Sequence, residues 1–188
     1  CDGQQCMKTA SIDGTFAISH RFTTASIEMV PDDPIVLLAQ ARRDLLKNRL
    51  DDAEVSLRRI VSARPDLIEA QARLGRILME QRPDLFLDWH ASLPQTADGH
   101  PEIWSIRGVW ADRHRRPRVA IRCFLEAVTL YPSHQEANYQ LSRLLARDGR
   151  KEVAARFGDR ARDISQMVYL SSELAGKPDH DMIQQCGE

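Results

Sequence analysis

The chain of 188 residues lacks both a long apolar run and an excess of charge of one sign. No stretch of about 18 consecutive apolar residues occurs, so the sequence predicts no membrane-spanning helix. Lys and Arg total 26 and Asp and Glu total 27, which gives a formal net charge of -1. General nucleic-acid binders and membrane-surface binders carry a marked basic excess, so this balance argues against both classes.

The short motifs by which many catalytic and metal sites can be recognised are also absent. The sequence contains no GxSxG, HExxH, GxxxxGK[ST] or GxGxxG, and no CxxC or CxxCH for zinc or covalently attached haem. Histidine and cysteine near the two ends could gather into a metal site only if the ends met, and their spacing matches no recognised ligand pattern. We therefore predict that the chain is not an enzyme and binds neither a metal ion nor a cofactor.

Lysine is scarce, because only four of the 26 basic residues are Lys and the other 22 are Arg. The guanidinium group of Arg is planar and can donate two parallel hydrogen bonds to one carboxylate. The bias therefore suits recognition of an acidic partner. A GC-rich genome would produce the same bias without any such function.

What the sequence does contain is a repeat. Small residues recur on helical patterns every 33 to 34 residues, at Ala41, Gly75, Gly108 and Ser142. About twelve residues later an Ala follows in three units, at Ala53, Ala120 and Ala154. A Pro closes two units, at Pro65 and Pro132. A period of this length is typical of stacked helix pairs. Each pair buries its apolar side only against its neighbours, and the stack leaves a surface open to a partner.

Close helix crossings explain why the recurring positions are small. A side chain larger than Ser at such a crossing would push the two backbones apart. In the first pair, Leu37, Ala41 and Leu45 follow the spacing of a buried helical stripe. Asp44 falls on the same stripe and interrupts it with a charge.

In this register the chain resembles the tetratricopeptide repeat family. Four units cover residues 34–67, 68–100, 101–134 and 135–168, about three quarters of the chain. The third unit, PEIWSIRGVWADRHRRPRVAIRCFLEAVTLYPSH, has the preferred large, small, small, aromatic, small and Pro residues at Trp104, Gly108, Ala120, Phe124, Ala127 and Pro132. The resemblance implies an all-α fold, a right-handed solenoid of stacked antiparallel helix pairs. It also implies a capping helix up to about residue 175.

Two units depart from the family pattern. In the second, Leu87 stands where Ala is usual, and Pro94 falls inside the last turn of the second helix. Because Pro lacks an amide donor and clashes with the preceding turn, we expect that helix to end near Leu93. In the fourth unit, Gln166 replaces the closing Pro.

The two ends differ from the repeats and define three regions: an arm (1–33), the repeat domain (34–175) and a tail (176–188). Residues 1–33 have no helical period and are partly rich in β-branched and aromatic residues, which predicts a non-helical, extended N-terminal arm or short strand. Asp33 followed by Pro34 suits the N-cap and first position of a helix. The polar C-terminal tail is expected to be weakly structured.

Cysteine leaves the cellular location open. We expect Cys123, inside a helix of the third unit, to be a buried thiol. A disulfide between Cys6 and Cys186 would tie the arm to the tail in an oxidising compartment, whereas free thiols would suit a cytoplasmic protein. Cys1 is either the lipidated first residue of a processed bacterial lipoprotein or a point where a longer sequence was cut. The location is therefore extracytoplasmic or periplasmic with a lipid anchor, or cytoplasmic.

The resemblance also implies where a partner would bind, because in this family the first helix of each unit lines the concave groove. The matching positions include a stripe of Arg with one Tyr, at Arg42, Arg76, Arg113, Tyr139, Arg143 and Arg147, with Arg73 adjacent. Acidic residues are interleaved with them, at Glu69, Glu80, Glu102, Asp112 and Glu136. Such a stripe can hold an acidic peptide by bidentate pairing with carboxylates. Interleaved Glu and Asp can instead pair with the Arg side chains inside the repeats and leave a mixed solvated face.

The distorted second unit offers a second interpretation of partner contact. Phe86 and Trp89 lie on its aberrant helix, where an exposed aromatic pair could dock a partner. Alternatively, the two rings fill the gap left by the shortened helix.

Two functions fit these observations. The first is a non-catalytic scaffold or assembly subunit that binds a protein or peptide partner, acidic if the Arg stripe contacts it, in its concave groove. The alternative is an accessory repeat domain, or a fragment, of a larger enzyme or redox protein whose catalytic part lies upstream. The full reading frame would separate them.

Overall fold

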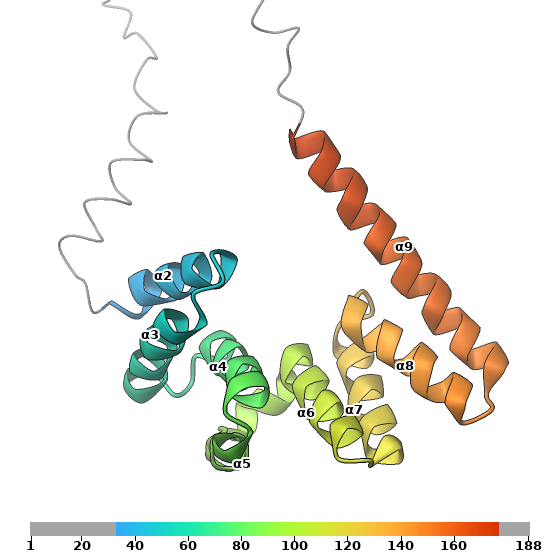
Figure 1. Ribbon diagram of the computed structural model, residues 1–188, viewed down its shortest axis with the longest axis horizontal. Coiled ribbons are helices and arrows are strands. Elements are labelled where there is room, and N and C mark those ends of the chain that lie inside the picture. Colours follow the sequence, from blue (N-terminus) through green and yellow to red (C-terminus); the bar gives the residue numbers. More distant parts are fainter. Residues whose placement is uncertain (1–32, 177–188) are drawn as a thin grey trace, which may run out of the picture. The chain divides into compact units, whose positions relative to one another are not determined.

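The computed structural model describes residues 33–176, which form helices joined by short turns (Figure 1). The α-helices are α2 (Pro34–Leu46), α3 (Leu50–Ala63), α4 (Ile68–Gln81), α5 (Pro83–Ser92), α6 (Pro101–Arg113), α7 (Pro117–Leu130), α8 (Gln135–Arg147) and α9 (Lys151–Gly176). A 3-10 helix, η1 (Gln95–Gly99), joins α5 to α6. No strand occurs between residues 33 and 176. The predicted all-α class is confirmed.

The chain divides into two compact units, of which the first ends at Arg64 and the second begins at Pro65. The described part of the first unit is the helix pair α2 and α3. Asp33 caps α2 by accepting a hydrogen bond of 2.7 Å from the backbone N–H of Ile35, and Pro34 occupies the first turn, as the sequence predicts. Asp44 is buried and forms an ion pair with Arg49, which explains how a charge is tolerated on the apolar stripe.

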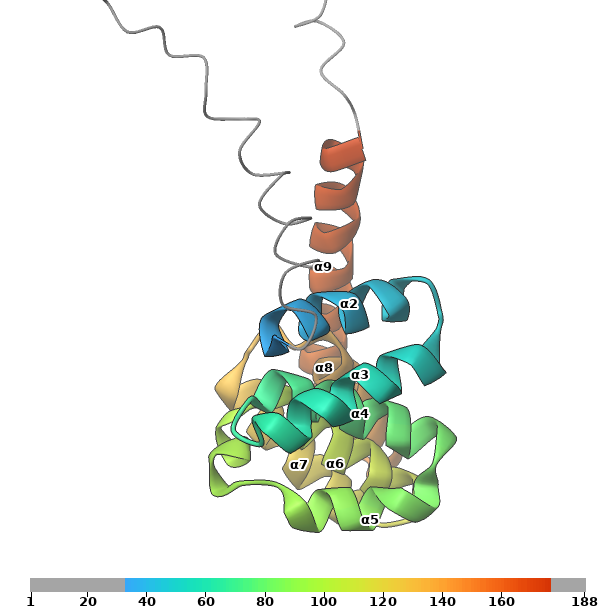
Figure 2. The same ribbon diagram turned by 90° about the vertical axis from the view of Figure 1, so that its left-hand side faces the viewer.

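In the second unit each helix packs against its neighbours in sequence. Helix α4 contacts α5 and α6, α6 contacts α7, α7 contacts α8, and α8 contacts α9 (Figures 1 and 2). The buried core between α6 and α9 contains Phe124, Leu141 and Leu144, together with small residues such as Ala120. The second unit is therefore a stack of helix pairs.

Three of the four turns inside the helix pairs share one backbone conformation. Asn48, Arg115 and Gly149 have φ angles of 56°, 57° and 82°, in the left-handed region. Asn48 and Arg115 are two repeat periods apart, and Gly149 follows one period later. In the second repeat only Arg82, with φ of -133°, separates α4 from α5. The deviation of this repeat therefore begins at its turn.

Glycine is required where two first helices meet the aromatic ring of their partner. A Cβ atom added to Gly75 would lie 2.1 Å from the ring of Trp89, and one added to Gly108 would lie 2.7 Å from the ring of Phe124. These distances are far below van der Waals contact, so a larger residue would separate the helices. The predicted role of the recurring small residues is confirmed at both crossings.

Helix α5 ends where the sequence indicates. Its last residue is Ser92, and the capping residue Leu93 is extended, with φ of -62° and ψ of 135°. Pro94 follows directly and cannot continue the helix. The chain then forms η1 instead of the last turn that a regular second helix would have.

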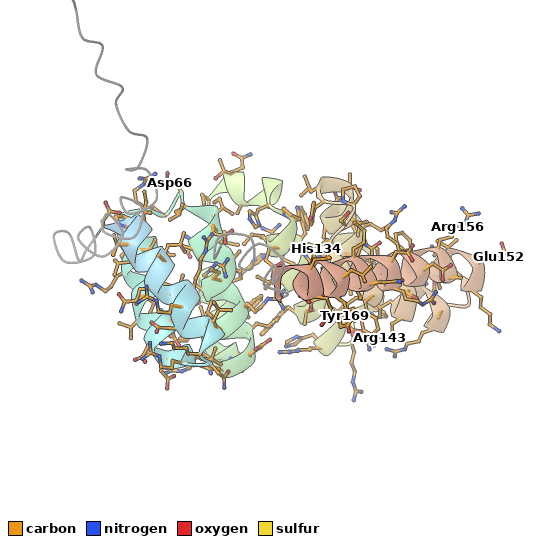
Figure 3. The ribbon with its side chains drawn as sticks, turned by 90° about the horizontal axis from the view of Figure 1, so that it is seen from above. Asp66, His134, Arg143, Glu152, Arg156 and Tyr169 are labelled. Atoms are coloured by element: carbon orange, nitrogen blue, oxygen red, sulfur yellow. The ribbon has the colours of Figure 1, made fainter. Side chains whose placement is uncertain are left out.

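Helix α9 differs from the prediction of a second helix to residue 168 followed by a separate capping helix to about residue 175. It is one uninterrupted helix of 26 residues that continues beyond α8 (Figure 1). The reason lies at Gln166, because no Pro stands there to end the helix. Its last turns expose Met167, Tyr169 (labelled in Figure 3) and Leu174, which are 71%, 61% and 75% exposed.

Candidate functional site

The first helices α4, α6 and α8 carry most of the side chains that the sequence predicts for partner binding. We call the polar surface of these three helices the first-helix face. It contains Arg73 and Arg76 from α4, Arg113 from α6, and Tyr139, Arg143 and Arg147 from α8. Arg42 lies on α2, in the first unit.

Arg76 is the centre of an ion-pair network on this face. Its Nε donates a hydrogen bond of 2.9 Å to Oε1 of Glu102 at the start of α6, and its Nη2 also contacts that oxygen. The same Nη2 lies 2.6 Å from Oε2 of Glu136 at the start of α8. The hydroxyl of Ser105 donates to that Glu136 oxygen at 3.1 Å. One guanidinium group therefore joins the first helices of three successive repeats.

The electrostatics of Glu102 follow from this arrangement. Burial favours the neutral acid, but hydrogen bonds from His134 and Arg76 and the charge of Arg76 favour the carboxylate more. Together they lower the pKa of Glu102 from 4.5 to about 2. The two carboxylates in turn raise the pKa of Arg76 above its usual value, against the effect of burial. Arg76 and Glu102 are therefore both charged at neutral pH.

Histidine extends the network in the register of the repeat. His134, which is labelled in Figure 3, directly precedes α8, and its Nε2 atom lies 3.0 Å from Oε2 of Glu102 in the preceding repeat. One repeat earlier, His100 lies 3.8 Å through Nε2 from Oε2 of Glu69. Each His also caps its own helix, because Nδ1 accepts a hydrogen bond from the backbone N–H of Ala137 or Glu102. Sequence reasoning missed both roles, although a His two residues before a Glu recurs at 100 and 134.

The remaining Arg side chains of the face are also largely engaged within the second unit. Arg73 donates through Nε to Glu69 at 2.9 Å, and Arg143 forms an ion pair with Asp112 (Figure 3). The Nη1 of Arg113 donates to the backbone carbonyl of Met79 at 3.1 Å. Of the two interpretations of the Arg stripe, the structure thus favours internal pairing for Arg73, Arg76 and Arg143.

Two of the predicted binding residues on α8, Tyr139 and Arg147, are exposed to solvent. Tyr139 is 59% exposed, and Arg147 is exposed near the end of the helix. Between residues 33 and 176, no acidic side chain forms an ion pair with Arg147. A ligand on this face would therefore meet an aromatic ring and a free cation at α8.

The suggestion of an exposed aromatic pair at Phe86 and Trp89 is wrong. Phe86 is 1% exposed and Trp89 is 5% exposed. Trp89 covers Gly75, and its indole Nε1 donates to Oε1 of Gln71 at 3.1 Å. Both rings are core residues, in line with the alternative that they fill space beside the shortened helix.

Several sequence predictions concern residues at the ends of the chain. Cys1, Cys6 and Cys186, and with them the lipidation and disulfide hypotheses, lie outside the described residues. Cys123 is buried as expected, and burial raises the pKa of its thiol. Within residues 33–176 no three potential metal ligands lie together, and none of the helices there is long and apolar enough to cross a membrane.

Comparisons with known proteins agree with the helical repeat. Residues 111–166 match the family model of the tetratricopeptide repeat. The fold is similar to a crystal structure of MamA, with a TM-score of 0.58 and 16% identity over 79% of this chain and 88% of that one. It is also similar to MamA 41-end from Desulfovibrio magneticus RS-1, with a TM-score of 0.56 and 16% identity over 80% and 86% of the two chains.

No curated protein sequence matches the chain. At identities this low, the likeness to the solved structures concerns the fold alone. Together with the matched residues it confirms the predicted stack of helix pairs.

Proposed function

We propose that this chain, a tetratricopeptide repeat protein, is a non-catalytic scaffold that holds a partner polypeptide on the first-helix face. The observation that carries the proposal is that α8 presents an exposed Tyr139 and an Arg147 that forms no ion pair with residues 33–176. The neighbouring Arg73, Arg76 and Arg143 are already held by carboxylates. Fixed side chains lose little conformational entropy when a partner binds. An exposed aromatic ring beside Arg is typical of the residues that dominate binding energy at interfaces.

The charges of the face limit the chemistry of the partner. Arg76 already contacts two carboxylates, so it is a poor binding site for a third. Arg147 forms no ion pair within the part of the chain that the structure describes, and Arg143 is 40% exposed although it pairs with Asp112. The partner we propose is a peptide segment with an acidic residue opposite Arg147 and an apolar side chain against Tyr139.

The proposal can be tested by capture of partners with matched variants of the full chain. We would immobilise the parent and the double variant Tyr139→Ala/Arg147→Glu and incubate each with extract of the source cells. The matched control is Tyr131→Ala/Arg122→Glu, which changes a similarly exposed Tyr and an exposed Arg away from the first-helix face. Arg122 lies on the second helix α7, and Tyr131 is the C-cap of that helix. Bound proteins are identified by mass spectrometry.

We expect at least one protein to be retained by the parent and the control and lost by the Tyr139→Ala/Arg147→Glu variant. Binding should weaken with added salt, because the Arg147 contact is solvent-exposed. Both variants should unfold at the temperature of the parent, since exposed side chains contribute little to folding. If the same proteins remain bound to all three chains, the first-helix face does not hold the partner.

A further inference from the structure

A cleft of about 440 Å³ opens elsewhere in the second unit, between α5, α6 and α7. Helix α5 contributes Phe86, Leu87 and His90, and α6 contributes Trp110. Helix α5 has ten residues, whereas the second helices α3 and α7 have fourteen each and α9 has 26. The cleft therefore lies where the repeat that Pro94 and the short turn at Arg82 distort meets the third repeat. Its volume falls within the range of small-molecule sites, about 300–1,000 Å³.

One wall of the α5–α7 cleft is aromatic. The rings of Phe86 and Trp110 stack with centroids 4.1 Å apart and an angle of 17° between their planes. The ring of His114 continues the wall at 4.0 Å from Trp110. At the rim, Leu87 and Val119 are 60% and 50% exposed. Phe86 is only 1% exposed and covers one face of Trp110, so a flat apolar group entering the cleft would pack against ring edges and against the side chains of Leu87 and Val119.

The charged groups that line the cleft are all basic. Arg107 has its charge balanced, because its Nη1 lies 2.7 Å from Asp98. Its Nε donates to Nε2 of His90 at 3.0 Å, so His90 acts there as a neutral acceptor. Burial and the charge of Arg107 lower the pKa of His90 accordingly. Arg116 lines the cleft and forms no ion pair with the described residues.

We propose that the α5–α7 cleft is a binding site for a small aromatic acid, whose ring packs edge-to-face against Trp110 and against Leu87 and Val119, and whose carboxylate pairs with Arg116. The apolar lining explains the aromatic part of the ligand, and a cation that forms no ion pair with the described residues explains the acid. Cys123, a protonated thiol with a raised pKa, adds to the apolar lining and not to the charge. This site is independent of the first-helix face.

The test uses naphthalene carboxylate and its neutral isostere naphthalene carboxamide as probes. Both are titrated into the full chain by calorimetry, while the indole N–H signal of Trp110 is followed by NMR. We expect the carboxylate to bind about tenfold more tightly than the carboxamide, because a charge-assisted hydrogen bond is worth about that factor. The Trp110 signal should shift on binding.

Two Arg variants provide the matched comparison. Arg116→Gln should weaken carboxylate binding about tenfold and leave the weak carboxamide binding unchanged. Arg118→Gln changes an Arg in the first turn of α7 that does not line the cleft, and this variant should bind both probes as the parent does. Both side chains are exposed, so neither change should lower thermal stability.

Three results would overturn the proposal. They are equal affinity for the two probes, a carboxylate affinity that survives Arg116→Gln, and the absence of any Trp110 shift at saturating probe. The variant Tyr139→Ala/Arg147→Glu should bind naphthalene carboxylate normally, which keeps this test separate from that of the first-helix face.

Discussion

Replacing Arg76 with Met removes the cation that holds Glu102 and Glu136 and keeps most of the apolar length of the side chain. The pKa of Glu102 falls from 4.5 to about 2 on folding, which corresponds to about 3 kcal/mol if each tenfold change is worth about 1.4 kcal/mol. The side chains of Glu102 and Arg76 are 31% and 33% exposed, so water screens part of this energy. His134 also keeps its contact with Glu102. We therefore expect Arg76→Met to lower the free energy of unfolding by about 2 kcal/mol.

The effect should depend on pH with a definite sign. The folded-state pKa of Glu102 is below its unfolded value, so its contribution is present above about pH 4.5 and is lost as the pH falls toward 2. The variant keeps the share that comes from His134 and lacks the share that comes from Arg76 at any pH. The difference in unfolding free energy between parent and variant should therefore be largest at pH 5 and above and shrink toward pH 2.

Urea unfolding followed by tryptophan fluorescence measures this difference. All three Trp residues lie in the second unit, so the signal reports the unit that contains the network. Arg143→Met is the matched control, because Arg143 is 40% exposed and pairs with the single carboxylate of Asp112. It should lower the free energy by less than about 1 kcal/mol. If Arg76→Met costs no more than this control, or if its cost is the same at pH 2 and pH 6, the network does not stabilise the fold as argued.

Two further changes test the packing of the repeats. Gly75→Ala should destabilise the second unit by about 1–3 kcal/mol, because the new methyl group meets Trp89. Gly99→Ala is the control and should not destabilise it, because a Cβ at Gly99 meets nothing within 4 Å. Equal urea midpoints for the two variants would contradict the close crossing at Gly75. Gln166→Pro should end α9 early and reduce the helical signal in circular dichroism, since a Pro in a helix interior costs about 3 kcal/mol. Gln166→Ala is the control and should keep the helical signal of the parent. An unchanged spectrum for Gln166→Pro would show that Gln166 does not decide the length of α9.

The fold could be predicted from sequence because the repeat imposes the same local constraints several times. Gly75 and Gly108 mark crossings that only a small residue allows, and Pro94 marks a helix end through covalent geometry alone. The prediction of a separate capping helix is wrong for a related reason. A capping helix requires a break, and between Lys151 and Gly176 no residue supplies one.

The candidate site was less predictable, because helix positions fix which residues share a face but not which side chains pair. Arg76 occupies a groove position in the sequence, yet its partners Glu102 and Glu136 lie 26 and 60 residues away, and their distances depend on how the repeats stack. The aromatic residues show the same limit. From the sequence, Phe86 and Trp89 can be predicted as exposed or as buried, depending on where α5 is placed. The position of α5 depends on the short turn at Arg82, which the sequence pattern does not specify.

The reach of Arg76 bears on how the second unit comes apart. In a linear repeat array each repeat contacts only its neighbours, so stability is a sum of local terms and the ends can fray one repeat at a time. The contact between Arg76 on α4 and Glu136 on α8 skips the intervening repeat. Opening the second repeat therefore takes Arg76 away from Glu102 of the third and Glu136 of the fourth, and opening the fourth takes Glu136 away from Arg76. These three repeats thus gain a coupling that favours their melting as one cooperative block.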